Sequence, residues 1–347
     1  MMLNKERKII EVLNKKVLVV GGTGLLGSRA IDHLVSKGYE VTTISLPSDG
    51  PQEDLYDGKV EYILKDINNL TDTEMLKIMR DKQYLLIAIG ADERYAPKIP
   101  ALTFYRKYNV QVTTNLLRMA RLSKIKNVVI LGSYFTYFNR VWPDLKLKET
   151  HPYIRSRCEQ MEIAFTYNSN VMKVTVLELP YIFGTLNHHT PLWNMITEQL
   201  NSNKHIYYPL GGTAMATANE VAEAVEGAFL YADGGKPYQV ASVNLKWKDF
   251  LSYLLKIQNQ EHKVLTPYSN LATTREMKKK MKDFKKEGRE SGLDLVKYLE
   301  FQKRDAYIDP SECMSNLKYN PDDIYAAINE TLKACETQLL KETKKKK

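Results

Sequence analysis

The stretch KVLVVGGTGLLG, residues 16–27, decides the fold of this chain. Residues 16–20 are mostly apolar and β-branched, which predicts a buried strand, and a glycine turn then leads into a helix over residues 25–37. Gly21 permits a tight turn, Gly24 lets the backbone approach a pyrophosphate, and Gly27 lets the helix pack close to the sheet. The helix N-terminus offers free N–H groups to an anion. The expected dinucleotide-binding residues are Gly21, Gly22, Thr23, Gly24, Leu25, Leu26 and Gly27.

Strands and helices alternate downstream of this turn. Apolar segments at 40–46, 59–64, 84–88, 127–131 and 173–178 are separated by helical patterns, the longest at 104–122 and 153–168. Nearly continuous apolar strands are typical of a parallel sheet that is covered on both faces. The predicted fold is therefore α/β: a Rossmann-type doubly wound parallel sheet with a smaller C-terminal substrate lobe.

The expected boundaries follow from where this alternation loosens. Residues 15–179 plus 238–244 form the dinucleotide-binding Rossmann domain, and residues 180–237 plus 245–335 form the substrate-binding lobe. The lobe includes an exposed, charged helical insertion at 272–300, a candidate lid, and a basic tail follows at 336–347. A short amphipathic helix is also expected at 3–14.

Composition narrows the function classes. No apolar run reaches the roughly 18 residues of a membrane span, and the charged N-terminus does not resemble a secretory signal. Three widely spaced cysteines predict neither a metal site nor a disulfide framework, so a cytoplasmic location is expected. The formal net charge of +9 is concentrated at 275–287 and 341–347. These segments are either solvated or a surface for a polyanion such as RNA, but few aromatic residues accompany them for base stacking.

The second strand leaves the choice between NAD and NADP open. An acidic residue at its end binds a ribose diol, whereas a basic residue accepts a 2′-phosphate. The segment TISLP, residues 43–47, offers neither. Ser45 could bond a ribose hydroxyl or a phosphate, and Arg29 is an alternative partner for a 2′-phosphate.

A set of motifs in a fixed order resembles the extended short-chain dehydrogenases/reductases, the group that includes the NAD-dependent epimerases and dehydratases. The motifs are the glycine loop, the Asp66-Ile67 turn, the segment NVQVTTNLLRMA at 109–120, Ser133, and Tyr153 with a base four residues on. The resemblance implies hydride transfer, with Tyr153 as acid/base, Ser133 orienting the reacting oxygen, and Asn109 in support. The implied cofactor contacts are Ser45, Asp66, Ile67, Gly90, Ala91 and Pro180. The implied substrate contacts are Tyr134, Tyr181, His188 and His189.

Three residues depart from the family pattern. Arg157 replaces the lysine that follows the tyrosine; it keeps the charge beside the phenol and cannot release a proton at working pH. Glu178 stands where many relatives carry arginine, and Phe138 where glycine is common. Asp92 and Glu93 follow the fourth strand and are interpreted as a solvated loop beside the site.

Two functions follow. One is an NAD(P)-dependent enzyme that acts on a hydroxyl- or keto-bearing metabolite such as a sugar nucleotide. The alternative is a non-catalytic dinucleotide-binding sensor or RNA-binding protein on the same fold. The family analogy further suggests a homodimer through the helices at 104–122 and 153–168.

Overall fold

A computed structural model describes residues 15–47, 58–186 and 193–345. Its main sheet has seven parallel strands in the order β10-β6-β5-β4-β1-β2-β3, which confirms the Rossmann-type prediction. The strands are β1 (Lys16–Val20), β2 (Glu40–Ser45), β3 (Val60–Leu64), β4 (Tyr84–Ile87), β5 (Asn127–Leu131), β6 (Lys173–Glu178) and β10 (Pro237–Gln239). The helix expected at 3–14 lies outside the described residues.

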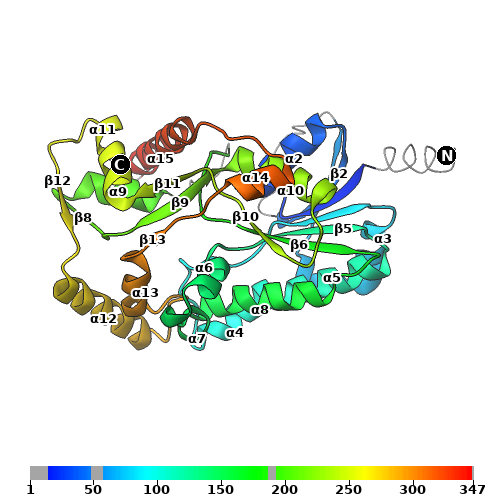
Figure 1. The fold of residues 1–347 in the computed structure, drawn as a ribbon, viewed down its shortest axis with the longest axis horizontal. Coiled ribbons are helices and arrows are strands. Elements are labelled where there is room, and N and C mark those ends of the chain that lie inside the picture. Colours follow the sequence, from blue (N-terminus) through cyan, green and yellow to red (C-terminus); the bar gives the residue numbers. More distant parts are fainter. Residues whose placement is uncertain (1–14, 48–57, 187–192, 346–347) are drawn as a thin grey trace.

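Side chains of each central strand alternate between two apolar layers. Val17 and Val19 of β1 pack toward the helices on one face, whereas Leu18 and Val20 pack toward those on the other. The first layer is α2 (Leu25–Ser36), α10 (Ala218–Tyr231) and α14 (Ser311–Leu317). The second layer is α3 (Asp72–Met79), α5 (Val112–Leu122) and α8 (Pro152–Thr166). Figure 1 shows the two layers on opposite sides of the strands.

Helix α10 lies in the covering layer of the main sheet. Val221, Val225 and Phe229 share one core with β1 and α2. The domain boundaries predicted from the sequence placed this helix in the substrate lobe. Its apolar packing against β1 and α2 corrects that placement. The segment 238–244, which the sequence boundaries assigned to the Rossmann domain, is also divided, because residues 243–246 join a second sheet.

The second lobe is built on small sheets and its own core. Strand β9 (Gly212–Thr217) pairs with β7 (Tyr181–Phe183), β11 (Val243–Lys246) and β13 (Asp305–Ala306), and β8 (His205–Tyr208) pairs with β12 (Val264–Pro267). Helices α9 (Asn194–Ser202), α11 (Trp247–Ile257) and α15 (Ile324–Lys345) cover them. Most of the expected basic tail therefore continues a helix.

The charged insertion at 272–300 has two different halves. Helix α12 (Asn270–Lys286) is exposed along most of its length, with Thr273 as its buried residue. Helix α13 (Leu295–Gln302) instead places Phe301 in an apolar cluster with Tyr153 and Phe135. The prediction of an exposed insertion is thus correct for α12 and wrong for α13. None of the helices in the described ranges combines the length and hydropathy that a membrane span requires.

Short elements join these parts. A π-helical segment, η3 (Arg106–Gln111), lies between α4 (Ala101–Tyr105) and α5. The others are α6 (Phe135–Val141), α7 (Leu147–Thr150) and the 3-10 turns η2 (Ile67–Asn69) and η4 (Pro143–Leu145).

Candidate functional site

The glycine loop after β1 is packed so tightly that three of its glycines, Gly21, Gly22 and Gly27, have no room for a side chain. Gly21 has φ +95°, and a Cβ there would lie 2.5 Å from Ile89 Cγ2. A Cβ on Gly27 would lie 2.1 Å from the carbonyl oxygen of Gly21, which confines α2 close to the turn. The turn is therefore held against the carboxyl ends of β1 and β4, where ligands bind in sheets of this type.

Gly24 differs from its neighbours because a Cβ there would make only an ordinary van der Waals contact. It is exposed, and the nearest atom to a Cβ built there is 3.6 Å away. Helix α2 begins at Leu25 without a side-chain cap, so in the described part of the chain its first N–H groups have no side-chain partner. A loop of bare amides at an uncapped helix start fits the pyrophosphate of a dinucleotide. Ser45 lies beside it and accepts a hydrogen bond from Thr23 N at 3.3 Å.

The end of β4 presents exposed backbone next to this loop. Gly90 is exposed, and the Asn109 side chain accepts from Ala91 N at 2.8 Å and donates to Ala91 O at 3.2 Å. Asn109 also donates to Ser156 Oγ on α8 at 3.0 Å. Asn109, the buried residue of the π-helical segment, therefore fixes the backbone of Ala91 directly.

Ser133, Tyr153 and Arg157 meet at the carboxyl end of β5. Arg157 Nε donates to the Tyr153 hydroxyl at 3.3 Å, and Ser133 is the other polar side chain that lowers the pKa of this phenol. Tyr153 and Arg157 are both buried. Burial raises the pKa of Tyr153 above that of a free phenol, while Arg157 and Ser133 oppose the rise. The phenol is therefore held protonated, beside the groups that would stabilise its anion.

The guanidinium of Arg157 is fixed by further contacts. Its Nη1 donates to Gln160 Oε1 at 2.9 Å, and Gln160 in turn donates to Thr113 Oγ1 at 2.8 Å. A Cβ on Gly90 would lie 3.0 Å from both terminal nitrogens of Arg157. The arginine thus fits where it is because residue 90 has no side chain.

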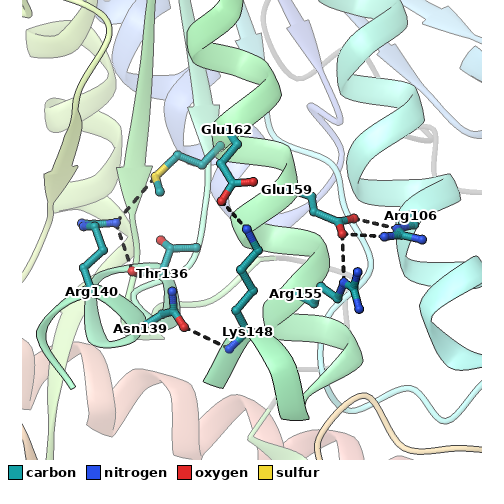
Figure 2. Close-up of polar contacts among 9 residues, drawn as sticks. Arg106, Thr136, Asn139, Arg140, Lys148, Arg155, Glu159 and Glu162 are labelled. Carbon is teal, nitrogen blue, oxygen red and sulfur yellow. Dashed lines mark hydrogen bonds and ion pairs between the residues drawn. The ribbon is translucent and has the colours of Figure 1, made fainter. Parts of the chain in front are cut away.

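Helix α8, which carries Tyr153 and Arg157, is anchored on its outer side by ion pairs (Figure 2). Arg106 of η3 binds both oxygens of Glu159, at 2.7 and 2.6 Å, and Arg155 binds the same carboxylate at 3.0 Å. Lys148 of α7 pairs with Glu162 one turn further along α8. These contacts fix the register between α8 and the segment that carries Asn109.

The unexpected glutamate at 178 is part of a buried ion pair. Glu178 is fully buried, and Arg140 binds its two oxygens at 2.7 Å each. Thr136 and Gln239 also donate to it. Phe138, the third departure, is buried in the aromatic cluster around Phe301.

The other residues predicted to contact the cofactor or the substrate differ in their burial and in their hydrogen-bond partners. Asp66 caps η2 by accepting from Asn68 N at 2.9 Å, with Ile67 partly buried beside it, and Pro180 precedes β7 partly exposed. Tyr134, an implied substrate contact, is buried against Phe135 and Phe138. Tyr181 is half-buried. His188 and His189 lie outside the described residues. Arg29 donates to Thr185 O at 3.0 Å, and its side chain therefore has a structural partner.

Residues 288–294, between α12 and α13, reach the start of α8 and were not identified from the sequence. Tyr153 N donates to Gly292 O at 2.9 Å, and Asp294 N donates to His151 Nδ1 at 2.9 Å. A third contact joins α13 to β7, because the hydroxyl groups of Tyr298 and Tyr181 lie 3.3 Å apart. About 140 residues separate Tyr153 from Gly292 and His151 from Asp294, so only the fold brings these partners together. No local sequence pattern marks them.

Comparisons with known proteins agree with this architecture. The model of the NAD dependent epimerase/dehydratase family matches residues 17–240. No curated protein matches the chain.

Solved structures with the same fold cover nearly the whole chain. A UDP-N-acetylglucosamine 4-epimerase from Methanobrevibacter ruminantium M1, in complex with UDP-N-acetylmuramic acid, has TM-score 0.67 and 18% identity over 94% of this chain and 99% of that one. A UDP-glucuronic acid 4-epimerase from Bacillus cereus, in complex with NAD, has TM-score 0.66 and 14% identity over 93% and 99%. MoeE5, in complex with UDP-glucose and NAD, has TM-score 0.64 and 12% identity over 93% and 99%.

Proposed function

Since the chain belongs to the NAD-dependent epimerase/dehydratase family, we propose that it is an enzyme that transfers a hydride between NAD and a carbon of a nucleotide sugar. The observation that carries the proposal is the convergence of Ser133, Tyr153 and Arg157 at the sheet edge that also holds the glycine loop. Solved structures of the same fold are described with NAD and UDP-sugars. In this proposal the sugar lies between that edge and the lobe that carries Tyr181 and Tyr298.

The glycine loop fits NAD in its shape and its donors. Gly24 leaves exposed backbone at the uncapped start of α2, where the pyrophosphate would be held, and Gly90 leaves exposed backbone after β4. When bound, NAD supplies the acceptor and donor of the hydride. Arg29 is bonded to Thr185 O, so within the described residues it does not favour a 2′-phosphate, in agreement with NAD as the family's cofactor.

The chain's own residues supply the proton chemistry. The Tyr153 phenolate takes the proton of the reacting hydroxyl as the hydride leaves, and the resulting phenol returns that proton in the reverse direction. Ser133 holds the same oxygen, and Arg157 stabilises the phenolate by its charge. Because arginine keeps its proton, the proton leaves the site by another route than residue 157.

The test is turnover by NAD-loaded protein with UDP-glucose and UDP-N-acetylglucosamine, followed by product analysis. Tyr153→Phe should lower turnover by about 10²–10⁴-fold, the typical contribution of an acid/base group. The same change should leave NAD binding within about twofold. Tyr167→Phe, at the other end of α8, is the matched control and should keep full activity. Turnover that survives Tyr153→Phe would refute the assignment. NAD binding without any turnover would favour the sensor, and salt-sensitive RNA binding lost on deleting residues 275–287 would favour the RNA-binding protein.

A further inference from the structure

A chain of three buried side chains leads from Tyr153 into the interface between α8 and α5. Arg157 donates through Nε to the Tyr153 hydroxyl and through Nη1 to Gln160 Oε1, the latter at 2.9 Å. Gln160 Nε2 in turn donates to Thr113 Oγ1 of α5 at 2.8 Å. Because arginine only donates, the amide must turn its oxygen toward Arg157 and its nitrogen toward Thr113. Gln160 is 2% exposed and Thr113 1%, so water competes little for these bonds.

Gln160 is the main anchor of the guanidinium. Among the described residues it is the only side chain besides Tyr153 that accepts a hydrogen bond from Arg157. The other contact of Nη1, with Leu131 O, is 3.5 Å long and therefore weak. Without the Gln160 acceptor, this end of the guanidinium would be held only by that contact, and its distance from the phenol would no longer be fixed.

The loop after β4 does not supply Arg157 with a carboxylate partner. The Asp92 carboxylate is paired with Arg94, whose Nε lies 3.1 Å from Oδ1. The Tyr105 hydroxyl anchors the same loop by donating to Asp92 O at 3.2 Å and to Tyr95 O at 2.6 Å. Asp92 and Glu93 are thus half-buried in an anchored loop, and the interpretation of these two residues as a solvated loop is wrong.

An uncharged anchor and a carboxylate would affect the phenol differently. Burial raises the pKa of Tyr153, and the charge of Arg157 opposes that rise. A carboxylate at residue 160 would pair with the guanidinium and cancel much of its field at the phenol. The amide of Gln160 binds the same nitrogen and carries no charge. It therefore fixes the arginine and leaves the positive charge available to the phenolate.

We propose that Gln160 is a positioning residue of the reaction: its uncharged side chain holds the Arg157 guanidinium at Tyr153, and Thr113 orients the amide for this role. The inference rests on the proposed function, because only a phenolate that forms during turnover needs a fixed positive charge. Since Gln160 acts through Arg157, its effect on the reaction must disappear when the arginine is removed.

Steady-state kinetics of the NAD-loaded full chain tests this as a double-mutant cycle, with whichever of UDP-glucose and UDP-N-acetylglucosamine is turned over. Gln160→Met, of similar volume, should lower kcat about tenfold at pH 7 and leave KM within about twofold, a common effect of losing a hydrogen bond to a charged group. The rising limb of the pH–rate profile should move to higher pH. In the Arg157→Met background, Gln160→Met should change kcat by less than about twofold.

Three variants separate the anchor, its charge and its orientation. Gln160→Glu should also lower kcat about tenfold, because its carboxylate keeps the contact and cancels the charge. Thr113→Val should lower kcat about threefold, since Gln160 can still reach Arg157, and Thr113→Ser, which keeps the hydroxyl, should restore it. Thr114→Val is the matched control: Thr114 is the next residue of α5, its hydroxyl donates to Val110 O at 2.8 Å, and kcat should not change.

A second readout does not need turnover. With 3,5-difluorotyrosine at residue 153, a phenol that ionises at lower pH than tyrosine, fluorine NMR follows its titration in each variant. Gln160→Met and Gln160→Glu should both raise the pKa of this phenol. In the Arg157→Met background, Gln160→Met should not raise that pKa further.

The outcomes separate the two proposals. An unchanged pKa of the phenol at residue 153 in Gln160→Met and Gln160→Glu, or an undiminished effect of Gln160→Met without the arginine, would overturn the role of Gln160. If Gln160→Met does not fold, Thr113→Val and Thr113→Ser carry the same test with residue 160 intact. Absence of turnover by the wild-type protein would overturn the proposed function, and the NMR titration would still decide whether Gln160 positions Arg157.

Discussion

Replacing Arg140 by methionine should destabilise the protein far more than removing a similar ion pair on the surface. Glu178 is fully buried and receives two bonds of 2.7 Å from Arg140. Arg140→Met leaves the carboxylate buried with only Thr136 and Gln239 as donors. Loss of one partner of a buried pair costs about 3–5 kcal/mol. Because two donors remain and the Arg140 side chain is 37% exposed, we expect about 3 kcal/mol.

Removing Glu178 should cost less stability than removing Arg140. Glu178→Gln leaves behind an arginine that water can reach, so this change should cost only about 1 kcal/mol. The double variant Arg140→Met/Glu178→Gln should then be more stable than Arg140→Met alone. Lys148→Met, which breaks the exposed pair with Glu162 in Figure 2, should cost at most about 1 kcal/mol.

Urea unfolding followed by circular dichroism and tryptophan fluorescence measures these differences at pH 7. Coincidence of the two signals checks that one transition is being compared. A cost below about 1 kcal/mol for Arg140→Met, or a double variant less stable than the single one, would show that burial of Glu178 does not control the energetics.

Three further predictions can be tested by substitution. Gly24→Ala should fold with near-native stability and weaken NAD binding at least about tenfold, whereas Gly27→Ala, whose Cβ would lie 2.1 Å from a carbonyl oxygen, should unfold at lower urea; equal effects of both would contradict the separate roles of the two glycines. Burial lowers the pKa of His151 to about 4, so the unfolded chain takes up its proton first and stability should fall by about 2 kcal/mol between pH 6.5 and 5; His151→Gln should remove this slope in urea midpoints, and an unchanged slope would refute the assignment. Because Arg157 lowers the pKa of Tyr153 against the effect of burial, Arg157→Met should move the rising limb of the pH–rate profile to higher pH, and an unmoved limb would mean that the arginine does not tune the phenol.

The fold could be predicted from the sequence wherever the evidence was local. The strand, the glycine turn and the helix of residues 16–36 are adjacent in the chain, so their order and the spacing of the glycines are visible in a single sequence. Helix α10 was assigned to the wrong part because an apolar helical face does not specify which sheet it covers. The contact of Gly292 with Tyr153 depends on two segments that meet only in the folded chain.

The substitution at residue 157 shows most clearly where the sequence stops being informative. A guanidinium in place of an ammonium group could be recognised from the sequence, and so could its inability to release a proton. Whether it would reach the phenol could not, because that depends on Gln160 accepting from its Nη1 and on Gly90 leaving room for its terminal nitrogens. The three residues fit one another: an alanine at 90 would press on the guanidinium, and an apolar residue at 160 would leave Arg157 Nη1 with only its 3.5 Å contact to Leu131 O. An arginine acquired after catalysis had been lost would not need neighbours that fit its guanidinium. We therefore take residues 90, 157 and 160 as one unit that keeps a fixed positive charge beside Tyr153.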